Sequence, residues 1–65
     1  MDYRCYFLGA NGRFLAVKEF TAETIAQAIF RAQAALSEST YPVCELWQRS
    51  RLVHRETRGV RLGQY

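Results

Sequence analysis

With 65 residues and a net charge of +3, the chain has room for one small domain with a modest basic excess. Its hydrophobic fraction of 49% excludes a disordered chain, and its two cysteines are too few for a secreted disulfide scaffold. A domain of this size buries only roughly 60% of its unfolded surface, so we expect marginal stability. With no disulfide scaffold, oligomerisation is the remaining means of stabilising the fold.

Two aromatic-rich stretches, residues 3–8 and 13–20, predict a β-hairpin around an Asn-Gly turn. Two loop lengths are compatible with this turn. With a two-residue loop Tyr6 faces Val17, whereas with a three-residue loop Cys5 faces Val17, because one residue of slip exchanges the faces of the second strand. We favour the three-residue loop because it gathers apolar residues on one side of the hairpin. These residues are Cys5, Phe7, Leu15 and Val17.

Residues 24–36 predict the one clear helix of the chain, and the strands before and after it need its apolar side to fold against. Thr24 is the expected N-cap, and Gln27, three residues later, can reach back to it in a capping box. Apolar residues at three-and-four spacing predict a buried stripe on one helix face. The stripe consists of Ile25, Ala28, Ile29, Ala32 and Leu36.

Phe30 lies outside this stripe, so we expect its ring to be exposed. Three interpretations are open for it. The tail residues Val60 and Leu62 fold back over the ring, the ring marks a partner surface, or it is a single exposed side chain without a role.

The stretch 43–56 alternates in hydrophobicity on both sides of an Arg-Ser pair and predicts a second hairpin. With a tight turn at that pair, Trp47 faces Leu52 and Glu45 faces His54. We expect Glu45 and His54 to form an ordinary charged pair on a solvated face of the sheet.

Together these elements predict an α+β fold of the ββαββ type within residues 1–56. A helical crossover makes the second and third strands point the same way, so the simplest sheet is antiparallel with strand order 2-1-3-4. The helix covers one face of this sheet and leaves the other face without a partner in the chain. Residues 57–65 contain two glycines and no sustained period, so we expect a mobile basic tail.

No residue set in the chain specifies a reaction or a ligand, so we expect a protein that is not an enzyme and uses no cofactor or metal. His54 is the single histidine, and the sequence indicates neither a nucleophile or substrate proton within its reach nor a tuned pKa. Cys5 and Cys44 fall in the two central strands, where we expect buried, reduced thiols. The chain opens without a basic leader and has no apolar run long enough to cross a bilayer, so we expect a cytoplasmic protein without membrane contact.

The uncovered sheet face is the candidate interaction surface. Aliphatic residues among its aromatic rings indicate contact with protein rather than with stacked bases. We therefore expect a small protein-interaction module that forms a homodimer and binds a further, unidentified protein. The candidate interaction residues of this module are Tyr6, Trp47, Leu52 and His54 on the sheet and Phe30 on the helix.

The alternative is a nucleic-acid-binding module in which Tyr6 and Trp47 stack bases. Basic residues concentrate toward the C-terminal end of the chain, where they could meet phosphates, although such an excess is more often a solvated face. These arginines are Arg49, Arg51, Arg55, Arg58 and Arg61.

Several segments resemble a group of short bacterial proteins of uncharacterised function. In that group the third strand typically reads Val-Glu-Leu-Trp, and Cys44 stands here at the valine position. The resemblance implies the ββαββ pattern and brings no activity or site. A weaker likeness is to antitoxin-type domains, which also begin with two strands and a helix, but the chain lacks their extra strand and DNA-binding appendage. The main resemblance covers residues 3–55 and rests on Tyr3 to Leu8, Asn11-Gly12, the helix start, Glu45-Leu46-Trp47 and Arg51-Leu52-Val53.

Overall fold

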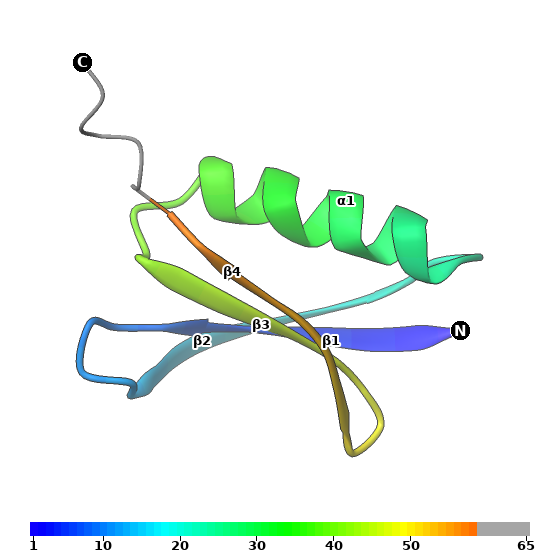
Figure 1. The fold of residues 1–65 in the computed structure, drawn as a ribbon, viewed down its shortest axis with the longest axis horizontal. Coiled ribbons are helices and arrows are strands. Elements are labelled where there is room, and N and C mark those ends of the chain that lie inside the picture. Colours follow the sequence, from blue (N-terminus) through cyan, green and yellow to red (C-terminus); the bar gives the residue numbers. More distant parts are fainter. Residues whose placement is uncertain (59–65) are drawn as a thin grey trace.

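The chain follows the predicted ββαββ order in a computed structural model, which describes residues 1–58 (Figure 1). Four strands form one antiparallel sheet with order β2-β1-β3-β4, and the helix lies across one face of it. The predicted α+β class and strand order are confirmed. Among the described residues, no helix is long and apolar enough to cross a membrane. The elements are β1 (Asp2–Leu8), β2 (Phe14–Thr21), α1 (Ile25–Ser37), β3 (Val43–Gln48) and β4 (Arg51–Thr57).

Helix α1 begins at Ile25 because Thr24 caps it. Thr24 has an extended backbone, and its Oγ1 accepts a hydrogen bond from Gln27 N at 3.1 Å. This bond satisfies an amide that the first turn of a helix leaves free. The Gln27 side chain does not return to Thr24, since its Oε1 accepts from Glu23 N, one residue earlier, at 2.8 Å.

The predicted helix stripe covers the core, with one correction. Ala28, Ala32 and Leu36 are buried, and their short or flexible side chains let the helix lie close to the sheet. Ile29 packs partly buried against this cluster. Ile25 is 40% exposed, so its assignment to the stripe is wrong. It follows the cap directly, and the buried part of the helix begins one turn later at Ala28.

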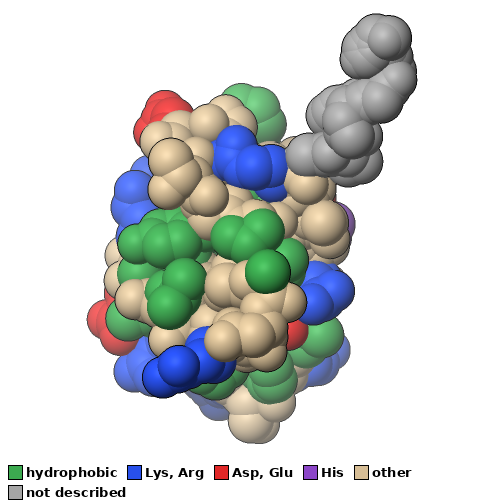
Figure 2. All heavy atoms as spheres, turned by 90° about the vertical axis from the view of Figure 1, so that its left-hand side faces the viewer, with side chains coloured by type: hydrophobic (Ala, Val, Ile, Leu, Met, Phe, Trp, Pro, Cys, Tyr) green, Lys and Arg blue, Asp and Glu red, His purple; other side chains and the backbone are tan. Residues whose placement is uncertain are grey.

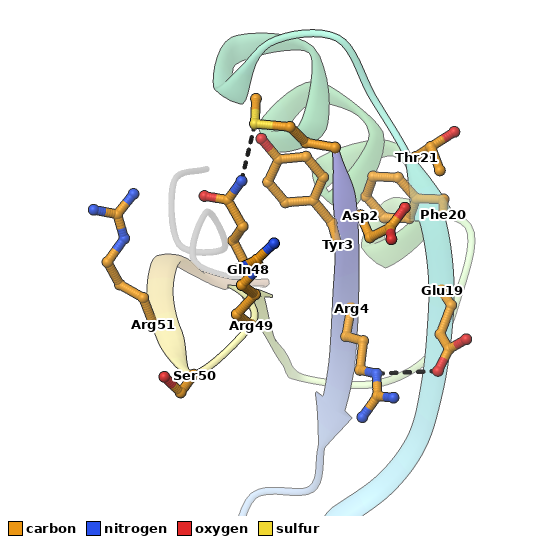
Figure 3. Close-up of a pocket in the computed structure, with 11 residues that line it drawn as sticks. Asp2, Tyr3, Arg4, Glu19, Phe20, Thr21, Gln48, Arg49, Ser50 and Arg51 are labelled. Atoms are coloured by element: carbon orange, nitrogen blue, oxygen red, sulfur yellow. Dashed lines mark hydrogen bonds and ion pairs between the residues drawn. The ribbon is translucent and has the colours of Figure 1, made fainter.

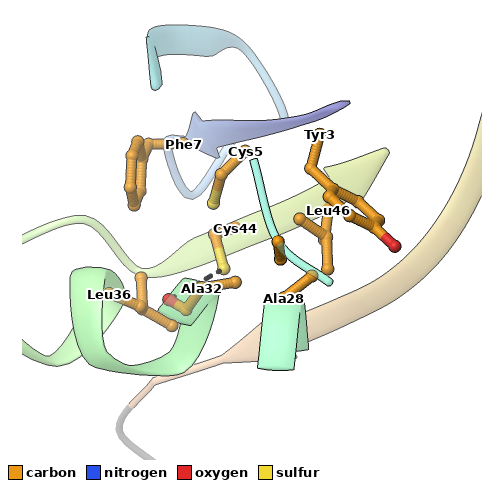
Figure 4. Close-up of a cluster of buried hydrophobic side chains, with 9 residues drawn as sticks. Tyr3, Cys5, Phe7, Ala28, Ala32, Leu36, Cys44 and Leu46 are labelled. Atoms are coloured by element: carbon orange, nitrogen blue, oxygen red, sulfur yellow. Dashed lines mark hydrogen bonds between the residues drawn. The ribbon is translucent and has the colours of Figure 1, made fainter. Parts of the chain in front are cut away.

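Between α1 and the sheet, alternate residues of β1 and β3 fill the core (Figure 4). Cys44 shows how closely helix and sheet approach, because its Sγ lies 3.9 Å from a carbonyl oxygen of α1. Toward the start of β1, Tyr3 stacks on Phe20 with ring centroids 6.0 Å apart. Toward its end, Phe7 stacks on Tyr41 at 5.1 Å. The central buried side chains are Tyr3, Cys5, Phe7, Ala28, Ala32, Leu36, Cys44 and Leu46.

The turn of the first hairpin has the favoured three-residue loop. Gly9 N donates a hydrogen bond to Arg13 O at 2.9 Å, so residues 10–12 form the loop. Gly12 has a φ of 84°, in the left-handed region that glycine adopts without a Cβ penalty. Asn11 also holds the turn, since its Oδ1 accepts from Arg13 N at 3.1 Å.

A bulge at Leu15 then shifts the register of the same hairpin. The pairing skips Leu15, which has no partner on β1. Beyond it Tyr6 faces Val17, the pairing of the two-residue alternative, and Cys5 faces Lys18. The grouping of Leu15 and Val17 with the buried side of β1 is therefore wrong. A bulge inserts one residue into one strand, so every residue beyond it changes face.

The second hairpin repeats this pattern. Its tight turn and the pairing of Trp47 with Leu52 are as predicted. The pairing then skips Val53, so His54 moves one position along β3 and no longer faces Glu45. The predicted pair of Glu45 and His54 is wrong for the same reason as the first register, because a bulge follows a correctly predicted turn.

Strand β4 ends at Thr57, one residue beyond the predicted domain boundary. Arg58 follows it, and its backbone N donates to Pro42 O at 2.8 Å. The rest of the predicted mobile basic tail, with Val60 and Leu62, lies outside the described residues.

The Arg58 side chain completes the end of α1. Its Nε donates to Tyr41 O at 3.0 Å, and its Nη2 donates to the carbonyl oxygens of Leu36 and Ser39. The last carbonyls of a helix have no partner within it, and a cation is favoured at this negative end of the helix dipole. The arginine that follows β4 therefore joins the helix terminus to the sheet.

Candidate interaction surface

The helix-free face is the side of the sheet opposite α1. The pairing of the four strands arranges its side chains in three rows, each running from β2 through β1 and β3 to β4. The rows are Glu19, Arg4, Trp47, Leu52; then Val17, Tyr6, Glu45, Arg55; and then Phe14, Leu8, Val43, Thr57.

An ion pair lies on the β2 side of the first row. Arg4 Nε is 3.0 Å from Glu19 Oε2, and both side chains are largely exposed. A hydrogen bond to Tyr6 Oη at 3.5 Å and the charge of Glu19 raise the pKa of Arg4 above its ordinary value. Exposed pairs of this kind add little stability. This pair matters because it neutralises the charges on that part of the face.

A second charged group crosses the middle of the face. Glu45 Oε2 lies 3.4 Å from Arg55 Nε, and Glu45 Oε1 accepts a hydrogen bond from Trp47 Nε1 at 3.1 Å. The indole N–H thus has its partner within the chain. Because these polar groups are paired with one another, a partner that covered them would leave few of them unsatisfied.

Apolar side chains on this face gather toward β2. Phe14 is 63% exposed and Val17 53%, and the Phe14 ring packs on Tyr6 with centroids 5.0 Å apart. Leu52, at the opposite corner, is 45% exposed. Figure 2 views the molecule from the end that carries the β1–β2 loop rather than from the helix-free face, and hydrophobic side chains gather in the middle of that end with Lys and Arg side chains around them.

The structure divides the candidate residues among three places. Trp47 and Leu52 face each other at the β4 side of the helix-free face. Tyr6 lies on the same face, beside Phe14. Phe30 is 69% exposed, as expected from its place outside the stripe, and it lies on α1.

His54 does not lie on the helix-free face, so that placement is wrong. It is opposite the buried Leu46, on the helix side of the sheet. His54 Nε2 lies 2.7 Å from Glu56 Oε1, and Gln33 of α1 donates to the same carboxylate oxygen at 3.2 Å. The hydrogen bonds from His54 and then Gln33 hold the pKa of Glu56 below its ordinary value. This group links β4 to the helix and is not available to a partner on the other face.

Val17 is the surface residue that sequence reasoning missed. The favoured register placed it with Cys5 on the helix side, whereas the bulge at Leu15 places it opposite Tyr6. The rejected two-residue register contained this pairing. In either register a group of apolar residues lies on the uncovered face, so the apolar pattern of the sequence does not decide between the two registers.

The two thiols form a buried pair in β1 and β3. Cys5 and Cys44 are both free and fully buried, which agrees with their predicted burial. A hydrogen bond between the two thiols raises the pKa of Cys5, and burial raises it further. The same hydrogen bond lowers the pKa of Cys44, so the burial of both side chains, rather than a shared pKa shift, keeps these thiols from a reagent or a metal ion.

The arginines of the nucleic-acid alternative are only partly available. Arg55 belongs to the ion pair on the helix-free face, and Arg58 binds the helix end. Arg61 lies outside the described residues. Arg49 and Arg51 are exposed, and neither forms an ion pair with a carboxylate within residues 1–58.

Comparison with other proteins adds no relative. Within residues 1–58, no three His, Cys, Asp or Glu side chains are grouped so that they could hold a metal ion. The resemblance to short bacterial proteins is supported as far as the ββαββ order of elements. No protein-family model, no curated protein and no solved structure matches the chain.

Proposed function

We propose that the protein is a small non-enzymatic interaction module that forms a homodimer through its helix-free face and acts by binding a further protein. The observation that carries this proposal is the exposure of Phe14, Val17 and Leu52 on a face whose charged groups are already paired. A domain of 65 residues with a helix on only one side of its sheet gains stability from a partner on the other side.

A two-fold axis would bring the same patch of both copies together. Sheets that pack face to face lie roughly 10 Å apart, a space that side chains from both inner faces fill. Phe14 and Val17 of each copy supply the apolar centre of such a contact. The ion pair of Arg4 and Glu19 lies beside them, as a polar rim does in protein interfaces.

The exposed surface supports a weak dimer rather than a permanent one. Burying the exposed half of an aliphatic or aromatic side chain contributes about 1 kcal/mol. Three such side chains on each copy, namely Phe14, Val17 and Leu52, therefore contribute about 6 kcal/mol. Association itself costs at least about 4 kcal/mol, which the half-buried Tyr6 and Trp47 must help to offset. At about 1 kcal/mol each, Tyr6 and Trp47 of both copies add about 4 kcal/mol, which leaves about 6 kcal/mol at the lowest association cost. We therefore expect a dissociation constant between about 40 µM and 1 mM.

The test compares two exposed phenylalanines of the same chain. Phe14 is 63% exposed on the helix-free face, and Phe30 is 69% exposed on α1. Phe14→Ser should shift the sedimentation equilibrium toward monomer, whereas the matched control Phe30→Ser should leave it unchanged. Far-UV circular dichroism of both variants should retain the wild-type fold, since both rings are mostly in solvent.

Two results would contradict the proposal. If the wild-type chain is monomeric at millimolar concentration, the helix-free face does not mediate self-association. If Phe30→Ser dissociates the dimer and Phe14→Ser does not, the contact lies on α1. Trp47→Ser gives a further check, because it removes apolar surface from the same face and should also weaken the dimer.

Nucleic-acid binding has less support as a function. Tyr6 and Trp47 lie on the open face, but Glu45 lies opposite Tyr6 and two residues before Trp47 on β3, where its carboxylate would repel a phosphate backbone. A gel shift with mixed oligonucleotides at increasing salt separates the two functions, because phosphate contacts weaken steeply with salt. A salt-sensitive shift that Phe14→Ser leaves unchanged would favour the alternative.

A further inference from the structure

A hollow of about 1230 Å³ lies at the end of the sheet where β1 begins and the β3–β4 hairpin turns (Figure 3). It is separate from the apolar part of the helix-free face, since Phe14 and Val17 do not line it. The arginines without an ion-pair partner line one side, and the acidic residues line the other together with the paired Arg4. On the hairpin side stand Gln48, Arg49 and Arg51, and on the β1–β2 side Asp2, Arg4 and Glu19.

Arg49 occupies a backbone position that does not suit it. Its φ is 58°, and among residues 1–58 it is the non-glycine residue with a positive φ. Two-residue hairpin turns prefer Gly, Asn or Asp at such positions, because a Cβ atom is disfavoured in the left-handed region. The local backbone preference therefore does not explain why an arginine stands at position 49. A functional contact of its side chain does explain it.

The guanidinium groups of Arg49 and Arg51 on this hairpin are not engaged in ion pairs within residues 1–58. Arg4 is already paired with Glu19 at 3.0 Å. Arg49 and Arg51, by contrast, form no ion pair within the described part of the chain, although both line the same hollow. The guanidinium group presents a planar set of N–H donors that fits phosphate oxygens in pairs.

Two further polar groups at the hollow lack strong partners. The Tyr3 hydroxyl is buried, and no hydrogen-bond partner for it lies within residues 1–58. Gln48 Nε2 donates to Met1 Sδ at 3.0 Å, and a thioether is a weak acceptor. The Tyr3 hydroxyl has no accessible surface, so a ligand in the hollow does not reach it. The Gln48 amide, whose partner is only a thioether, is the donor left for oxygen atoms of a ligand.

We propose that this hollow binds the phosphate groups of a compact phosphorylated small molecule, held by Arg49 and Arg51 with Gln48 as a further donor. The positive groups without partners stand only on the hairpin side. Asp2 and the carboxylate of Glu19 on β2 border the other side. An extended nucleic-acid backbone crossing the hollow would meet those carboxylates, whereas a compact anion contacts the hairpin alone.

The experiment titrates the isotope-labelled full chain with tripolyphosphate and follows backbone and arginine side-chain signals by NMR. Saturable shifts should be confined to the hollow, with Gln48 and Arg51 among the largest. Arg51→Gln should weaken binding about tenfold, the loss expected when a charge-assisted hydrogen bond is removed. Arg13→Gln is the matched control, because Arg13 is exposed at the opposite end of the sheet and should retain wild-type affinity.

Two variants separate ligand binding from a structural role. Arg49→Gly should raise the urea midpoint, because glycine accepts a positive φ, and should at the same time weaken tripolyphosphate binding. Tyr3→Phe is the control: it should leave the midpoint equal or higher, since it removes a hydroxyl without a partner, and should leave tripolyphosphate binding unchanged, because that hydroxyl lies beneath the surface of the hollow. A purely structural role for Arg49 predicts no loss of affinity at unchanged or higher stability.

Three outcomes would overturn the proposal. Sodium chloride at matched ionic strength reproduces the shifts, or Arg13→Gln weakens binding as much as Arg51→Gln does; either result means non-specific charge screening. A single-stranded oligonucleotide that binds more tightly than tripolyphosphate and shifts Arg13 as well would mean that the basic surface as a whole binds a polymer. The homodimer is tested by Phe14→Ser, so the two proposals can fail separately.

Discussion

Arg58→Ala tests the contact that joins β4 to the end of α1. The side chain donates to the carbonyl oxygens of Leu36, Ser39 and Tyr41, and all of these bonds are partly buried. A hydrogen bond from a charged donor contributes about 1.5 to 3 kcal/mol, and the bonds of one guanidinium are not additive. We expect the free energy of unfolding to fall by about 2 to 3 kcal/mol, out of a total of about 3 to 10 kcal/mol for a domain of this size. The midpoint of thermal unfolding should fall by roughly 10 to 20 °C.

The measurement is urea unfolding followed by far-UV circular dichroism, with Arg55→Ala as the control. Arg55 lies in β4, three residues before Arg58, but its side chain is 53% exposed and pairs with Glu45 on the surface. Its loss should cost less than about 1 kcal/mol. Arg58→Lys should lie between the two variants, because lysine keeps the charge and loses the planar set of donors. Equal midpoints for Arg58→Ala and Arg55→Ala would refute the role of Arg58 at the helix end.

Further predictions concern the helix, the thiols and the dependence of stability on pH. Leu36→Ala should lower the free energy of unfolding by about 2 to 5 kcal/mol and Thr24→Ala by about 1, because the first opens a cavity and the second removes a cap. The reverse order of urea midpoints would contradict the packing of the helix. Cys5 and Cys44 should react slowly with a thiol reagent in the native protein and quickly in denaturant, since both are fully buried; rapid native labelling of both would show that they are accessible. Hydrogen bonds from a histidine and a glutamine lower the pKa of Glu56, so its stabilising effect is complete above the ordinary value of 4.5 and is lost as the pH falls through the lowered one. The stability of Glu56→Gln should therefore vary less over this acid range than that of the wild type, and parallel profiles for the two would contradict the assignment.

Local signals explain why the order of elements could be predicted. The cap residue Thr24 and the apolar spacing that includes Ala28 and Leu36 both indicate a helix that begins near residue 24. The structure has this helix directly after Thr24. The strand order follows from short hairpins and one helical crossover, which leave few simple topologies. These features depend on neighbours in sequence, so the sequence alone contains them.

The surface was harder to predict because both hairpins contain a bulge. The skipped residues are Leu15 and Val53, and the errors in the placement of Val17 and His54 follow directly from them. Val53 packs partly buried against the core, so its bulge is stabilised by tertiary packing. No local residue preference signals this, since the gain arises only when the sheet and the helix are assembled.

Arg58 shows a second limit of reasoning from sequence. Among basic residues near the end of a chain, it looks like a solvated charge. Its three carbonyl partners belong to Leu36, Ser39 and Tyr41, which are far from it in sequence. Only the return of β4 past the helix end brings them together.

The two bulges also bear on how copies of this chain can polymerise. Strands β2 and β4 are the two edges of the sheet, and each contains one bulge. An unbroken edge strand can accept a strand from another copy, and β2 of one copy joined to β4 of the next would repeat without closing into a fibre. A skipped residue interrupts the regular spacing of N–H and C=O groups that such growth requires. Leu15 and Val53 therefore act against open-ended extension of the sheet at both of its edges.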